Sequence, residues 1–76
     1  MKNSISFTIF KGDKYYVAEG VGVPVVTQGK TLDELSRNIL EAVTLYLESP
    51  IIRKKFTIKK PSIFMNIELP ATYAAV

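Results

Sequence analysis

The chain has 76 residues and no cysteine, so it is long enough for one domain and contains neither a disulfide framework nor a thiolate metal site. Ten basic and seven acidic side chains give a net charge of +3, well short of the excess expected of a dedicated nucleic-acid-binding protein. Hydrophobic residues make up 47% of the chain, but no apolar run approaches the roughly 18–20 residues of a membrane span, and no signal peptide is evident. We therefore expect one globular domain over residues 1–76, located in the cytoplasm and without membrane contact.

The first 19 residues predict a β-hairpin. In residues 4–11, Ile5, Phe7 and Ile9 alternate with polar side chains, which is typical of a strand with one apolar face. Phe10 breaks this alternation by placing a large ring on the polar face. Gly12, which is free to take a positive φ, begins a turn, and residues 15–19 form an antiparallel second strand.

A bend, a third strand and a helix start are predicted next. Two glycines and a proline within residues 20–24 indicate the bend, and residues 25–28 form a short strand. Gly29 suits a tight turn. Thr31 is the predicted N-cap, because its hydroxyl can accept from the amide of Glu34 while Glu34 returns a bond to the amide of Thr31.

Residues 31–49 predict one long amphipathic helix, which Pro50 ends near Ser49. Leu45 is the exception to its pattern, because it projects among polar side chains. At about 100° per residue, the apolar side consists of Leu32, Leu35, Ile39, Leu40, Ala42, Val43, Tyr46 and Leu47, and the polar side of Asp33, Glu34, Arg37, Glu41, Thr44 and Glu48.

The remaining residues contain one clear strand. Residues 51–60 are ambiguous, with a weak strand-like alternation over 55–59, whereas residues 63–69 alternate cleanly between apolar and polar. The predicted fold class is α+β: a small, mostly antiparallel β-β-β-α-β sheet with one helix packed on one face. Its core is predicted to consist of Leu35, Ile39, Val43 and Tyr46 packed against Ile5, Phe7, Ile9, Met65 and Ile67.

Three segments together resemble the HicB-like antitoxins: "YYVAE" at residues 15–19, "VVTQGKTLDEL" at residues 25–35 and "NILEAVTLYLE" at residues 38–48. The resemblance covers residues 4–49, and its most specific part is the Thr-Gln-Gly turn with the helix that follows. The chain departs from the pattern at the bend, where Val23-Pro24-Val25 stands in place of a Leu-Pro-Gly. The matching residues are Tyr15, Val17, Pro24, Thr27, Gln28, Gly29, Thr31, Leu32, Glu34, Asn38, Glu41, Ala42, Tyr46 and Leu47.

The resemblance implies a truncated RNase H-like core that binds and masks a small HicA-like RNA-cleaving toxin. It also implies the toxin-binding half of the family alone, so no C-terminal DNA-binding domain is expected. We expect the chain to form a homodimer or a higher homo-oligomer, since a core of this size often gains stability by association. The alternative is a small nucleic-acid-binding domain, or an oligomeric domain that has no toxin partner.

The residue inventory predicts no enzymatic activity. The chain has no histidine, and none of its serines has a neighbour in sequence that would activate it. Its carboxylates have capping, turn or surface explanations rather than a converging arrangement. We therefore expect no catalytic residues, no metal site and no cofactor.

The predicted partner-binding residues form two groups. Exposed apolar side chains at Phe10, Tyr16, Leu45 and Phe64 would form a partner patch, although scattered surface hydrophobes are normal, and Phe10 and Phe64 could instead cover each other on neighbouring strands. The acidic helix side would meet a basic toxin; it consists of Asp33, Glu34, Glu41 and Glu48. The basic residues Arg53, Lys54, Lys55, Lys59 and Lys60 would either block edge pairing or meet phosphate or an acidic partner surface. A nucleic-acid-binding site would use the four lysines with Phe56.

Overall fold

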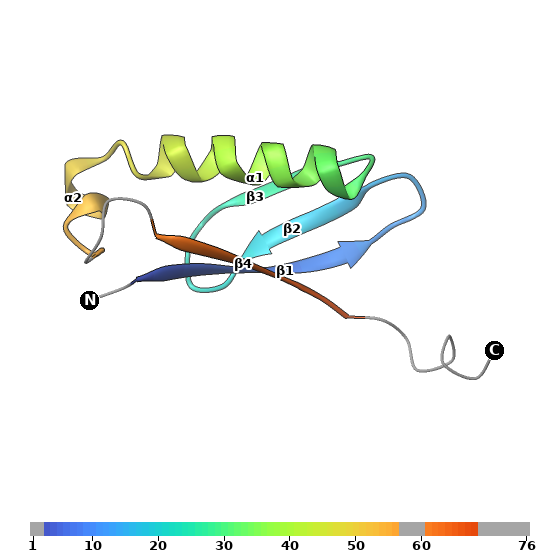
Figure 1. Cartoon of the computed structure of the whole chain (residues 1–76), viewed down its shortest axis with the longest axis horizontal. Coiled ribbons are helices and arrows are strands. Elements are labelled where there is room, and N and C mark those ends of the chain that lie inside the picture. The colour runs from blue at the N-terminus through green and yellow to red at the C-terminus, as the bar shows by residue number, and fades with distance from the viewer. Residues whose placement is uncertain (1–2, 57–60, 69–76) are drawn as a thin grey trace.

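The computed structural model describes residues 3–56 and 61–68. Its elements are arranged as one sheet with one long helix above it (Figure 1). In chain order they are β1 (Ser4–Lys11), β2 (Tyr16–Gly20), β3 (Val26–Gly29), α1 (Leu32–Tyr46), α2 (Pro50–Arg53) and β4 (Ser62–Ile67).

The four strands form a mixed sheet in the order β3-β2-β1-β4. The predicted hairpin is confirmed, because β1 pairs antiparallel with β2, and β2 pairs antiparallel with β3. β4 instead pairs parallel with β1. β3 runs in the same direction as β1, and the chain then passes through α1 and α2 before it reaches β4. A long connection of this kind allows β4 to run parallel to β1. The α+β class and the single long helix are thus as predicted, while the last pairing makes the sheet mixed.

The core lies between α1 and the face of the sheet that it covers. Leu35, Ile39 and Val43 of α1 are almost completely buried, as predicted. They follow one another at intervals of four residues, which places them on one side of a helix. On the sheet, Ile5, Phe7 and Ile9 are buried as predicted, and the remaining buried hydrophobic residues are Ala18, Val23, Val25 and Phe56.

Three residues that were predicted for the core are less buried. Tyr46 and Met65 are only half-buried, and Ile67 is 40% exposed, so its assignment to the core was wrong. Ile63, Met65 and Ile67 do point to the α1 side, because they pair in register with buried residues of β1. However, α1 packs mainly on β3 and β2, and β4 lies on the far side of β1.

The start of α1 is fixed by side-chain hydrogen bonds. The hydroxyl of Thr31 accepts from the amide of Glu34 at 3.0 Å, which confirms Thr31 as the N-cap. The carboxylate of Glu34 accepts from the amide of Lys30 at 2.9 Å, rather than from the amide of Thr31. The return bond of the predicted capping box is therefore displaced by one residue.

The end of α1 differs from the prediction. α1 stops at Tyr46 with Leu47 as its C-cap, before the expected Ser49. Pro50 does not simply terminate a helix: it occupies the first turn of α2, where the missing N–H costs no hydrogen bond. Lys54 and Lys55 follow in a turn, so the weak strand interpretation fails at Lys55, while Phe56 forms an isolated β-bridge and residues 57–60 lie outside the described part of the chain.

Gly29 is required where β3 turns into α1. A Cβ at this position would lie 2.6 Å from the amide nitrogen of Leu35 and 2.8 Å from its Cα. These are backbone atoms of a buried helical turn, so they cannot move aside without shifting α1. The absence of a side chain at Gly29 therefore allows the helix to lie close to the strand that precedes it.

We expect Gly29→Ala to lower the free energy of unfolding by about 1–3 kcal/mol, the usual cost of overpacking. Urea denaturation followed by circular dichroism measures this loss. Gly22→Asn is the comparison variant: a Cβ built there meets no atom within 4 Å, so any loss reports only the strain of its φ of +76°, which asparagine adopts more readily than most residues. Equal stability of Gly29→Ala and the wild type would contradict the close approach.

Candidate partner-binding surfaces

The predicted apolar partner residues lie on three different surfaces. Phe10 and Phe64 are on the outer sheet face, defined as the face turned away from α1. Tyr16 pairs with Lys11 and faces the α1 side, where it packs against the core. Leu45 is on the solvent side of α1 and is 60% exposed. The four residues therefore do not form one patch.

Phe10 and Phe64 also lie apart on the outer sheet face. Phe64 pairs in register with Ser6, which is four residues before Phe10 on β1. At about 3.3 Å per residue this separates the two rings by about 13 Å along the strands, with Thr8 between them. The hypothesis that the two rings cover each other is therefore wrong. The cross-strand neighbour of Phe10 is Val17, a half-buried residue of β2.

The acidic side of α1 is present in the structure, with one change. Asp33, Glu41 and Glu48 are exposed. Glu34 is half-buried and one of its oxygens already accepts the amide of Lys30, so it is primarily a capping residue. Exposed Leu45 lies four residues after Glu41 on α1, so this carboxylate is its neighbour on the helix. Glu48 follows in the turn after α1, where its amide donates to the carbonyl oxygen of Leu45. We call Asp33, Glu41, Leu45 and Glu48 the helix surface.

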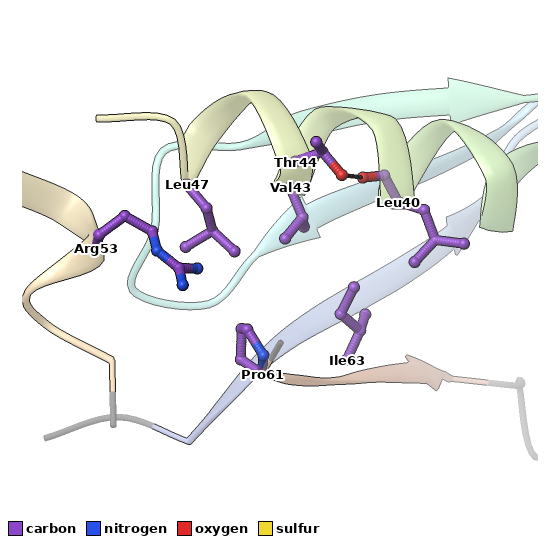
Figure 2. A pocket seen from close by; sticks show the side chains of 7 residues that line it. All are labelled: Leu40, Val43, Thr44, Leu47, Arg53, Pro61 and Ile63. Carbon is purple, nitrogen blue, oxygen red and sulfur yellow. Dashed lines mark hydrogen bonds between the residues drawn. The ribbon is translucent and has the colours of Figure 1, made fainter. Parts of the chain in front are cut away.

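An apolar groove that was not predicted lies between α1 and β4 (Figure 2). Its volume is about 420 Å³. The same two elements are joined by a hydrogen bond, which the hydroxyl of Ser36 donates to the sulfur of Met65 at 3.6 Å. A signal was available in Leu40, which belongs to the apolar side of the helical pattern but is 58% exposed. The lining residues are Leu40, Val43, Thr44, Leu47, Arg53, Pro61 and Ile63.

The basic segment does not form a nucleic-acid-binding surface with Phe56. Lys54 and Lys55 are exposed, but the Phe56 ring is 6% exposed and belongs to the hydrophobic core. A buried ring cannot stack on a base. Lys59 and Lys60 lie outside the described residues.

The described residues contain no group of three or more Asp, Glu or His side chains placed to hold a metal ion. In the same part of the chain, no helix has the length and apolarity needed to cross a membrane. No protein-family model, curated protein or solved structure matches the chain.

The burial of Phe56 leads to a prediction that separates a core role from a ligand-binding role. We expect Phe56→Ala to destabilise the fold by about 3–5 kcal/mol, as for other buried rings. The same substitution at Phe64, which is 54% exposed, should change stability by less than about 1 kcal/mol. Thermal or urea unfolding of the two variants makes the comparison. Similar stability losses at the two positions would contradict this assignment.

Proposed function

We propose that this chain is a HicB-like binding domain that neutralises a small, basic, HicA-like RNA-cleaving toxin by direct occlusion. The resemblance of residues 4–49 to that family supports this proposal. The α+β class, with one helix on a small sheet, is compatible with it. In this function the domain breaks no bond: it covers the surface with which the toxin would bind RNA.

The observation that carries the proposal is the charge of α1. Within Leu32–Tyr46 there are three acidic residues and one basic residue, a net charge of −2, although the whole chain has a net charge of +3. Acidic charge is thus concentrated on one exposed helix of an otherwise basic protein. A basic RNA-binding protein has the complementary charge, and such complementarity directs association and excludes wrong partners.

Leu45 gives the helix surface an apolar centre. Its side chain is 60% exposed, with Glu41 one helical turn before it and Glu48 in the turn that follows α1. Interfaces commonly place an apolar anchor inside a polar rim, so that the anchor contributes affinity and the rim contributes specificity. We assign Leu45 as the anchor and the carboxylates as the rim.

Co-expression with the protein encoded by the neighbouring reading frame tests the proposal. We expect this neighbour to be a small basic protein that co-purifies with the chain, and we expect stoichiometric addition of the chain to stop its cleavage of RNA. A neighbour that does not co-purify, or that cleaves RNA equally well in the presence of the chain, would remove the basis of the antitoxin proposal.

Charge reversal on the helix surface provides the sharper experiment. We expect Glu41→Lys with Glu48→Lys to weaken toxin binding by about tenfold or more at low salt, and by less as salt screens the charges. The matched control is Glu19→Lys with Glu68→Lys, which makes the same change in net charge at exposed positions outside the helix surface. Isothermal titration at two salt concentrations measures both. Equal losses in the two variants would show a general charge effect and no role for the helix surface.

A further inference from the structure

The outer edge of β4 carries backbone groups that no other described strand pairs with. β4 is the last strand of the sheet, and β1 lies on its other side. The amide of Ser62 donates to the carbonyl oxygen of Asn3 at 3.1 Å, so the backbone groups of Ser62 face β1. In a parallel pair, alternate residues direct both their N–H and C=O groups to the partner strand. The groups of Ile63, Met65 and Ile67 therefore point to the outer edge.

β4 lacks the features that usually protect an edge strand. Its sequence, SIFMNI, contains no charged residue and no proline. The opposite edge is different, because β3 has only four residues and the side-chain amide of Asn38 donates to the carbonyl oxygen of Gln28 at 2.7 Å. Of the two edges in the described sheet, β4 is therefore the longer and the less protected.

We propose that β4 pairs antiparallel with β4 of a second copy, around a two-fold axis at Met65, to form one continuous sheet. This axis places Met65 opposite itself and Ile63 opposite Ile67 of the second copy. In an antiparallel pair, such facing residues exchange both of their hydrogen bonds. All outward N–H and C=O groups of the three residues then find partners, and Pro61, which has no N–H, ends the ladder on the outer edge.

The absence of charge on the edge favours a second copy as the occupant. The outward residues are spaced equally on both sides of Met65, and a strand without charges meets no repulsion from itself. An axis at Phe64 would pair Ile63 with Met65 but would place Ile67 opposite Pro61, which has no donor. Both registers form six hydrogen bonds, but the Phe64 axis leaves the carbonyl oxygen of Ile67 without a donor, whereas the Met65 axis pairs every outward group within β4.

Side chains support the same arrangement. Ile63, Met65 and Ile67 share the α1 side of the sheet, where Ile67 is 40% exposed. Pairing places Ile67 of the second copy beside Ile63, which lines the groove between α1 and β4. Apolar pairs that face each other across strands stabilise a sheet. The second copy thereby extends the apolar wall of the groove.

Measurements of molar mass and of amide hydrogen exchange provide the first test of pairing through β4. Light scattering should give about 17 kDa at high protein concentration, twice the 8.5 kDa of one chain, and the mass should fall on dilution. The amides of Ile63, Met65 and Ile67 should exchange slowly only in the dimer. Those of Phe64 and Asn66, which face β1, should be protected in both states. A mass of 8.5 kDa at every concentration overturns the proposal.

Two variants test whether the edge is responsible. Ile67→Lys places a charge on the edge and should weaken dimerisation by about tenfold or more. Ile51→Lys is the matched control, because Ile51 is 73% exposed on α2 and should leave dimerisation unchanged. Met65→Pro removes an outward N–H without removing a bond to β1, so it should give a folded monomer. A dimer that survives Ile67→Lys overturns the proposal.

Cross-linking tests the register, and the chain has no natural cysteine to interfere. The Met65 axis places Phe64 opposite Asn66 of the second copy in a non-hydrogen-bonded pair, with Cα atoms about 4.5 Å apart. That separation permits a disulfide. A mixture of the Phe64→Cys and Asn66→Cys proteins should form a disulfide-linked heterodimer, and neither protein should cross-link with itself. Self-linking of Phe64→Cys would establish the other register and overturn this one.

The outcomes are independent of those for the antitoxin proposal, because β4 and the helix surface share no residue. Loss of dimerisation in Ile67→Lys with toxin binding intact supports the proposal for β4. A monomeric protein whose Ile63, Met65 and Ile67 amides become protected only when a different protein binds would overturn self-pairing and assign the edge to that partner.

Discussion

The packing of α1 against the apolar face of the sheet is the interaction on which the rest of the structure depends. Leu35, Ile39 and Val43 are buried against β-strand residues that include Phe7 and Ile9, and each such side chain contributes about 1.5–3 kcal/mol when fully buried. In a chain of this length, few other contacts contribute as much to the free energy of folding. The N-cap and the turn at Gly29 set where the helix begins and how near the sheet it lies.

A single helix cannot cover four strands. An α-helix with its side chains is about 10–12 Å wide, whereas neighbouring strands are about 4.7–4.9 Å apart. Because α1 packs mainly on β3 and β2, the α1 side of β4 receives little cover. The apolar groove, the half-buried Met65 and the exposed Ile67 all follow from this mismatch in width. The same mismatch leaves an apolar strand at the edge of the sheet.

The two proposed interactions use different physical forces on different parts of the molecule. The helix surface combines carboxylates with one exposed leucine, so it suits a basic protein and responds to salt. The edge of β4 is uncharged and presents backbone donors and acceptors, so it suits another strand. This separation would allow two copies to pair through β4 while the helix surface of each remains accessible to a toxin.

The sequence by itself determined much of the local structure of this protein, although not the end of α1 or the short helix α2. Alternation in residues 4–11, Thr31 as the N-cap, and the four-residue spacing of Leu35, Ile39 and Val43 each report a periodicity or a hydrogen bond between near neighbours, and all were predicted correctly. The tertiary structure decided what depends on residues distant in sequence: the parallel pairing of β4 with β1, the burial of Phe56, the exposure of Ile67 and the separation of Phe10 from Phe64. Strand pairing and register arise from contacts across the whole chain, and a local pattern carries no information about which neighbour a strand will meet.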